Sequence, residues 1–276
     1  MHLVKLNLAR NCLKYLIKLY GINEIFIPFY TCPTVWNAVR QTGCRVEFYH
    51  IDTNFLPVQH FPKDAFILYT NYFGLNTENC KNLAKIYPNL IVDNSHSFFS
   101  ESVGLASFNS LRKFFDVTNG AYLFVEKLLE NDFEQDNLYL PSVKFNQNYP
   151  EFLNNELLLN QEVSIKTLSK NVQNKMKNID FCFEKERRIH LFKQYEKIFK
   201  ADNEIFLMLS DGEVPYCYPF CTSKTIYNKI FNENGINLLK LWKNYPKNFE
   251  EYYLNNTAAI PLDDEILANK IISIFS

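Results

Sequence analysis

The 276-residue sequence lacks several features that define large classes of protein. No run of lysine and arginine reaches five residues and the formal net charge is −1, which argues against a nucleic-acid groove or a basic membrane surface. No apolar stretch approaches about 18 residues, so we expect no membrane-spanning segment. The first residues also lack the basic region and apolar run of a signal peptide.

The cysteines form no C-x-x-C pair, the spacing that is typical of metal and redox sites. Seven cysteines, an odd number, indicate reduced thiols in a cytoplasmic protein, most of them filling the core. We expect no metal site. Apolar residues make up 47% of the chain, which is enough to form one large domain, or a large and a small one.

Strands and helices are predicted to alternate through the first half. Seven segments rich in β-branched and aromatic residues predict strands, at 3–7, 24–28, 45–51, 66–70, 90–93, 105–109 and 121–126. Helical spacing of apolar residues predicts helices at 9–20, 34–41 and 77–86, the last with Thr77 as its N-cap. This alternation predicts a mostly parallel, doubly wound sheet whose ligands bind at the carboxyl ends of the strands.

The second half has a different pattern. Residues 127–149 are polar and predict a long connection, and 151–199 predicts one long helix. Strands at 216–220 and 257–261, with helices at 223–234 and 263–275, predict a compact α+β unit. We therefore predict a large α/β domain over 1–150, followed by a helical link and a smaller α+β domain over 151–276.

One stretch carries residues suited to pyridoxal phosphate (PLP) chemistry. Asp93 ends the strand at 90–93, His96 follows it, and Lys113 precedes two phenylalanines and the later Gly120. An acid can keep the pyridine nitrogen of PLP protonated, and a lysine can bond to its aldehyde. Such pairs also arise by chance: Asp93 could be a helix N-cap, and Lys113 a surface residue beside Arg112. Arg112 itself either binds phosphate or is solvated.

The order of the motifs resembles the DegT family of sugar aminotransferases, which are fold-type I PLP-dependent enzymes. The segments that carry the resemblance are 9–13, 27–32, 69–74, 93–96, 113–120, 215–220, 235–236, 241–242 and 260–262. The resemblance implies an α/β fold of the fold-type I PLP-transferase class. This fold has a mostly parallel seven-stranded sheet with helices on both faces, plus a smaller C-terminal α+β domain.

The resemblance also implies roles for individual residues. It makes Lys113 the catalytic lysine that bonds to PLP, Asp93 the catalytic acid at the pyridine nitrogen, and His96 a neighbour of the PLP hydroxyl. Asn71 has either a polar role at the next strand end or a turn role.

The phosphate of PLP requires hydrogen-bond donors. The helix start at Ala9 and Arg10 is the first candidate, because helix N-termini supply free N–H groups and a favourable dipole. Ser110 is the second candidate, with Ser107 as its rival, and all these residues could equally be ordinary structural ones.

The sequence departs from the family at several points. We expect the usual N-terminal segment, which helps to cover the active site, to be missing. The stretch from Asp93 to Lys113 is shorter than in typical members. Cys32 takes the place of the aromatic residue that usually stacks on PLP, and Tyr30 either replaces it or is a packing residue. Arg187 and Arg188 are expected on a solvated helix face.

By this resemblance the protein moves an amino group from an amino acid donor, glutamate, to a keto sugar, nucleotide-linked, for surface glycan synthesis. It implies small-molecule substrates, a cytoplasmic location and a homodimer with shared active sites. Two alternatives remain open: a different PLP-dependent reaction, and a non-catalytic relative that binds a ligand or partner.

Overall fold

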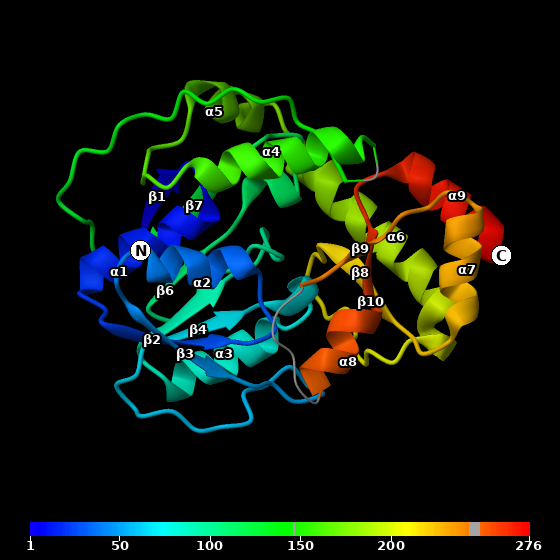
Figure 1. The fold of residues 1–276 in the computed structure, drawn as a ribbon, viewed down its shortest axis with the longest axis horizontal. Helices are drawn as coiled ribbons and strands as arrows, with labels where there is room; N and C mark the ends of the chain where they lie inside the picture. Colours follow the sequence, from blue (N-terminus) through cyan, green and yellow to red (C-terminus); the bar gives the residue numbers. More distant parts are fainter. Residues whose placement is uncertain (146, 243–248) are drawn as a thin grey trace.

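The computed structural model describes residues 1–145, 147–242 and 249–276, whose strands form a large and a small sheet (Figure 1). The large sheet has the strand order β1-β7-β6-β5-β4-β2-β3, and β7 runs antiparallel to both of its neighbours while the pairs among β2 to β6 are parallel. Its strands are β1 (His2–Leu6), β2 (Glu24–Pro28), β3 (Arg45–Tyr49), β4 (Ile67–Thr70), β5 (Leu90–Asp93), β6 (Ala106–Phe108) and β7 (Ala121–Val125). This confirms the predicted mostly parallel, seven-stranded sheet.

Helices cover both faces of this sheet, as predicted. α1 (Ala9–Tyr20) and α2 (Pro33–Arg40) lie on one face and α3 (Thr77–Ile86) on the other (Figure 1). α1 ends at Gly21, whose φ of 61° is the left-handed conformation that stops a helix and that glycine adopts without strain. Thr77 is not the N-cap of α3: that position is Asn76, and Thr77 is the first helical residue.

The smaller sheet is antiparallel, in the order β8-β10-β9. Its strands are β8 (Cys217–Cys221), β9 (Leu239–Lys240) and β10 (Thr257–Pro261), accompanied by α7 (Thr225–Glu233), α8 (Phe249–Asn256) and α9 (Glu265–Phe275). The α+β character of this part is confirmed, whereas the domain boundary at residue 150 stays a prediction. The two-residue strand β9 and the helix α8 were not predicted.

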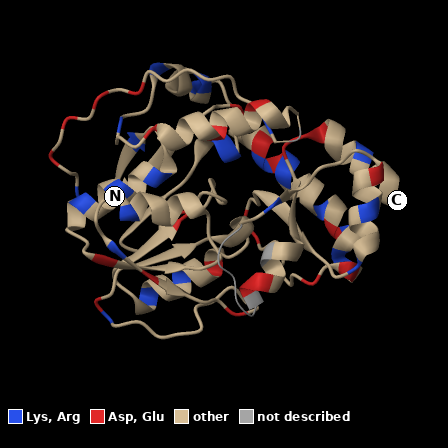
Figure 2. Ribbon diagram, in the orientation of Figure 1, with Lys and Arg blue, Asp and Glu red and all other residues tan. Residues whose placement is uncertain are grey.

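Charged residues of both signs lie mainly on the helices and loops, while the strands of the large sheet are mostly uncharged (Figure 2). None of the described helices combines the length and apolar character that crossing a membrane requires.

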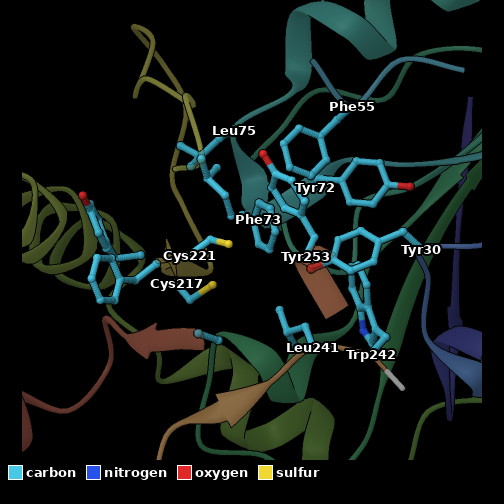
Figure 3. Packing of buried hydrophobic residues seen from close by; sticks show 14 of the residues in the cluster. Tyr30, Phe55, Tyr72, Phe73, Leu75, Cys217, Cys221, Leu241, Trp242 and Tyr253 are labelled. Atoms are coloured by element: carbon cyan, nitrogen blue, oxygen red, sulfur yellow. The ribbon is translucent and has the colours of Figure 1, made fainter. Parts of the chain in front are cut away.

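An aromatic cluster joins the two sheets. Tyr30, Phe55, Tyr72 and Trp242 are all buried and pack as one group (Figure 3). The rings of Tyr30 and Tyr72 lie 5.8 Å apart and stacked, and Trp242 lies edge-on to Tyr30 at 4.8 Å. Because this cluster spans both sheets, it fixes the small sheet against the carboxyl ends of β2 and β4.

The single long helix predicted over 151–199 is wrong. This region forms three helices, α4 (Tyr149–Gln161), α5 (Lys170–Lys177) and α6 (Phe181–Phe199). Side-chain N-caps start the second and the third: Ser169 accepts from Val172 N–H and Asp180 accepts from Phe183 N–H. These two caps break the chain into separate helices.

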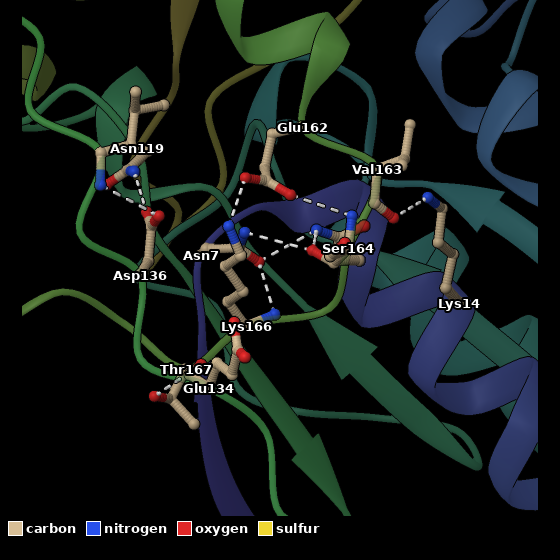
Figure 4. A network of polar contacts seen from close by, with 12 residues as sticks. Asn7, Lys14, Asn119, Glu134, Asp136, Glu162, Val163, Ser164, Lys166 and Thr167 are labelled. Carbon is tan, nitrogen blue, oxygen red and sulfur yellow. Dashed lines mark hydrogen bonds and ion pairs between the residues drawn. The ribbon is translucent and has the colours of Figure 1, made fainter.

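The link between α4 and α5 crosses the start of α1. Lys14 Nζ donates to Val163 O at 2.6 Å and Asn7 Oδ1 accepts from Lys166 N–H (Figure 4). Asn11 Nδ2 also donates to Ser164 O at 2.7 Å. These contacts hold α4 in a fixed place next to the carboxyl edge of the large sheet.

Candidate active site

The carboxyl ends of β4, β5 and β6 bring the predicted site residues to one edge of the sheet. Asp93, the last residue of β5, lies between Thr70 of β4 and Phe108 of β6 in the strand register. Lys113 follows β6 in the short 3-10 helix η2 (Leu111–Lys113). In parallel sheets this edge is where ligands bind.

The seven-residue spacing from Lys113 to Gly120 corresponds to a closed loop. Leu111 N–H donates to Gly120 O at 2.9 Å, and Gly120 N–H donates to Asn7 O at 2.6 Å. Gly120 has a φ of +106°, and a Cβ there would lie 2.8 Å from a methyl carbon of Leu111. A larger residue would therefore push this loop, residues 111–120 and called the lysine loop below, away from the end of β1.

Lys113 lines a cavity of about 330 Å³ that also opens on His96, Cys32 and Arg112. Its Nζ lies 5.5 Å from the centre of the Tyr216 ring. Burial lowers the pKa of the Lys113 amine, while Cys32 and Asp93 act in the opposite direction. A lysine with a lowered pKa has more of its free amine at neutral pH, which is the form that attacks a carbonyl.

Asp93 is only 5% exposed and interacts electrostatically with Lys113. Its Oδ1 accepts a hydrogen bond from Ser95 N–H at 2.8 Å. Burial raises the pKa of Asp93, and the nearby Lys113 and the bond to Ser95 oppose that rise. A desolvated carboxylate of this kind binds a cationic partner strongly, because little water competes for it.

Asn71, whose role the sequence left open, acts as a turn residue. Its amide donates to Asn94 Oδ1 at 3.1 Å, and its Oδ1 accepts from Asn76 N–H at 3.1 Å. These bonds shape the turn η1 (Tyr72–Gly74), which leads into α3.

His96 is 1% exposed and lies between two parallel rings. The Tyr216 ring lies 4.5 Å away and the Trp242 ring 5.2 Å away, with interplanar angles of 18° and 16°. Neither ring nitrogen has a hydrogen-bond partner within the described part of the chain. Burial lowers the pKa of His96, so the imidazole is neutral at pH 7 and offers an unused donor and acceptor.

Gly74 allows the His96 turn and the Tyr216 segment to come together. Its φ is +78°, and a Cβ there would lie 2.3 Å from His96 O and 3.0 Å from Val214 O. Tyr216 N–H donates to Phe73 O at 2.8 Å in the same turn. Only glycine fits this position, so the glycine of segment 69–74 serves to dock the small sheet on the site.

Glu156 of α4 enters the cavity and pairs with Arg112 through both guanidinium nitrogens, one of them at 3.2 Å. Each side chain is about one-quarter exposed, so Arg112 is neither fully solvated nor free. Burial raises the pKa of Glu156, but Arg112, Arg10 and Lys113 outweigh it and the pKa lies below its usual range. Glu156 was not predicted, because it lies inside a segment whose pattern indicated only a continuous helix.

The remaining predicted residues lie outside this cavity wall in the described part of the chain. Arg10 reaches Asn160 Oδ1 at 2.5 Å, and Ala9 is the first residue of α1. Ser110 is buried just before η2, and Ser107 donates to Ser102 at 2.7 Å. Tyr30 belongs to the aromatic cluster and packs against Trp242, which lines the cavity.

The expectation of a solvated Arg188 is wrong. Its side chain is 0% exposed, and its guanidinium donates to the carbonyl oxygens of Tyr216, Lys113 and Phe114. Arg187 pairs with Glu184 on the same helix. Arg188 points inward because three backbone carbonyls from distant segments converge on it, which composition alone does not reveal.

No model of a known protein family matches the sequence, and no curated protein matches it either. Among solved structures, a DegT DnrJ EryC1 StrS aminotransferase from Brucella abortus is 13% identical with a TM-score of 0.66, covering 100% of this chain and 85% of its own. PseC of Helicobacter pylori, an aminotransferase of pseudoaminic acid biosynthesis, is 17% identical with a TM-score of 0.63, covering 100% and 87%. The PLP form of Spr1654 from Streptococcus pneumoniae is 11% identical with a TM-score of 0.67, covering 99% and 86%. The chain therefore has the fold of these aminotransferases, the fold that its resemblance to the DegT family implies.

Proposed function

We propose that the protein is a PLP-dependent aminotransferase of the DegT type. It moves an amino group from an amino acid, glutamate, to a keto sugar, nucleotide-linked, for surface glycan synthesis. The observation that carries the proposal is that Lys113 and the unpaired His96 line one cavity, with the buried Asp93 close enough to Lys113 to influence its pKa. The fold neighbours support it, since the Brucella abortus and Helicobacter pylori proteins are aminotransferases and PseC is involved in the biosynthesis of pseudoaminic acid.

The residues at the cavity fit PLP. The cavity volume of about 330 Å³ falls within the range of small-molecule sites. Lys113 would hold the aldehyde carbon, Asp93 the pyridine nitrogen, and one of the unpaired nitrogens of His96 the ring hydroxyl. Arg112 would hold the phosphate, and the start of α1 at Ala9 and Arg10, together with Ser110, stays the other predicted source of donors. When bound, PLP supplies an electron sink that stabilises negative charge on a substrate carbon.

Side chains of this protein would then transfer and hold the protons of the reaction. Lys113, whose pKa is lowered by burial, would take up a proton from the substrate carbon at Nζ and give it back from the same atom. Asp93 would hold the protonated pyridine nitrogen, because a charge-assisted hydrogen bond to a buried carboxylate is strong. His96 stays fixed between Tyr216 and Trp242, so its ring orients a bound ligand without rotating.

The cavity also suits substrates that carry negative charge. The described residues of its wall include four cations, Lys113, Arg112, Lys144 and Lys240, against three carboxylates, Glu156, Asp263 and Asp264. Amino acid donors carry a carboxylate and nucleotide-linked sugars carry a diphosphate, and both are attracted by such cations.

The test is to find which lysine bonds to the cofactor. Borohydride reduction in the presence of PLP, followed by peptide mapping, should place the pyridoxyl group on Lys113. Lys113→Arg should take up no label, while Lys144→Arg, which changes a lysine in the same cavity, should be labelled like the wild type. Glutamate added to the PLP-loaded protein should then release its keto acid.

A label on Lys144 or Lys240 would contradict the site assignment. A folded protein that takes no label would instead support the non-catalytic alternative. A label on Lys113 without keto acid from any amino acid tried would point to another PLP-dependent reaction.

We also propose a homodimer with shared active sites, in the cytoplasm. The seven cysteines are free thiols, as is usual for proteins of a reducing compartment. Three large side chains on α4, Tyr149, Leu153 and Leu157, recur every four residues and are 49%, 47% and 59% exposed. Such an exposed apolar face next to the cavity is suited to cover by a second copy.

Light scattering should therefore give the mass of two chains. A Leu153→Glu/Leu157→Glu variant should shift the mass towards a single chain, because charges are costly in an apolar interface. Ile266→Glu, a change at a residue of α9 that is 87% exposed, should leave the mass unchanged. A wild-type monomer at micromolar concentration that binds PLP tightly would contradict the shared site.

A further inference from the structure

Arg188 of α6 is a fully buried cation whose partners are mostly backbone oxygens. Its guanidinium donates to Tyr216 O at 2.9 Å, to Phe114 O at 3.1 Å and to Lys113 O at 3.3 Å. It also stacks over the Phe114 ring at 4.5 Å. The nearest carboxylate, Asp263, is 4.0 Å away and is shared with Lys144, whose Nζ is 3.1 Å from the same oxygen.

These contacts are costly to maintain. A guanidinium removed from water loses several kcal/mol of hydration, which a carboxylate at 4.0 Å offsets only in part. An apolar residue of similar volume would fill the same space without that loss, but it would leave three carbonyl oxygens unpaired. The contacts of Arg188 therefore stabilise the arrangement in which these three carbonyl oxygens converge on its guanidinium.

Two of the three carbonyls belong to the lysine loop and the third to the segment that carries the Tyr216 ring. That ring lies 5.5 Å from Lys113 Nζ and stacks on the His96 ring at 4.5 Å. One planar guanidinium thus joins the backbone of the lysine to the wall against which its amine lies. A planar fork with five donors on three nitrogens can reach acceptors that lie apart, whereas a lysine ammonium carries its three donors on a single nitrogen.

We propose that Arg188 is a positioning residue, which holds the backbone of Lys113 against the Tyr216 segment and so keeps the Lys113 amine in the cavity wall. The proposal rests on the proposed function for its meaning, since it assigns Lys113 the reactive amine. It concerns the chain without cofactor, however, so it can be tested even if PLP does not bind.

The primary variant is Arg188→Lys, which keeps the charge and much of the volume but loses the planar fork. If the hydrogen bonds from the guanidinium to the three carbonyl oxygens are lost, Lys113 gains access to water. Its pKa then rises towards the ordinary value of about 10.4. We expect a rise of roughly half a unit or more, which lowers the reactive fraction of the amine about threefold at neutral pH. The other groups that influence Lys113, Cys32, Asp93, Arg112 and Glu156, are unchanged in this variant.

The measurement is the rate at which an amine reagent, trinitrobenzenesulfonate, modifies Lys113 as a function of pH, read by peptide mass spectrometry in protein without PLP. Arg187→Gln is the matched control, because it removes the neighbouring cation of the same helix, whose partner is Glu184 and not the lysine loop. Unfolding in urea gives the stability of each variant separately.

A raised pKa in Arg188→Lys with a wild-type value in Arg187→Gln supports the proposal. An unchanged pKa together with lower stability would overturn it, since Arg188 would then be a structural residue only. Arg188→Ala adds a second test: millimolar guanidinium should restore the low pKa if the variant folds, and restored stability without a restored pKa would again contradict the proposal. If Arg188→Ala does not fold, Arg188→Lys decides the question.

Discussion

Replacing Asp93 by asparagine should lower the catalytic rate more than it lowers the affinity for PLP. The two side chains have nearly the same shape, so the bond from Ser95 N–H to the oxygen at this position can persist. Loss of one charge-assisted contact weakens binding by roughly 1.5–3 kcal/mol. In terms of Kd this is a factor of roughly 10–150. The rate falls further because a protonated pyridine nitrogen contributes most in the transition state, when negative charge develops on the substrate carbon.

The control for this change is Asp116→Asn. Asp116 lies three residues after Lys113 and is exposed, so the variant has the same loss of charge near the lysine loop without altering the buried acid. The affinity is measured by titration with PLP and the rate by keto acid release from glutamate. Equal rates in Asp93→Asn and the wild type would refute the role of Asp93.

The same substitution should have the opposite effect on stability when no cofactor is present. Burial raises the pKa of Asp93 above the value of about 3.9 that holds in the unfolded chain. Between these two values the folded chain holds a proton that the unfolded chain has released, so the free energy of unfolding decreases as the pH rises through that window. Asparagine removes this cost, and Asp93→Asn without PLP should be at least as stable as the wild type at pH 7.

Local signals allowed much of the large sheet to be predicted. The helix at 9–20 was predicted with its true ends, because a left-handed Gly21 stops it and its apolar residues recur at helical spacing. The strands at 24–28 and 90–93 were also found with their true ends. In these segments the chemistry of neighbouring residues determines the structure, and the sheet order then brings Asp93 and Lys113 together.

The features that the sequence did not reveal depend on contacts between distant segments. Glu156 is 44 residues from Arg112, and its place depends on the path of the link that crosses α1. Arg188 is buried by carbonyls that are 28 to 75 residues away. The caps Ser169 and Asp180 look like ordinary polar residues of a helix until the chain turns there. Such side chains are fixed by tertiary packing, which overrides local preference.

The pair formed by Arg112 and Glu156 should have opposite effects on PLP binding when its two members are changed one at a time. Arg112→Gln removes the cation that we assign to the phosphate and should weaken binding by roughly 1.5–3 kcal/mol. Glu156→Gln removes a carboxylate that occupies the same guanidinium and repels the phosphate, so it should tighten binding. The matched control is Glu151→Gln, which removes the other carboxylate of α4, one that contacts Asn148 at the start of the helix.

The double variant Arg112→Gln/Glu156→Gln shows whether Glu156 influences PLP binding through Arg112 or independently of it. If Glu156 influences PLP only through Arg112, the double variant should bind like Arg112→Gln alone, so the two effects would not add. Binding to the wild type should also weaken with added salt, and less so in Arg112→Gln, because salt screens the attraction that this variant lacks. If Glu156→Gln instead weakened binding as much as Arg112→Gln does, Glu156 would be needed to hold Arg112 in place. The carboxylate would then be a support of the phosphate site, and its position among Arg10, Arg112 and Lys113 would stabilise the cations without competing with the ligand.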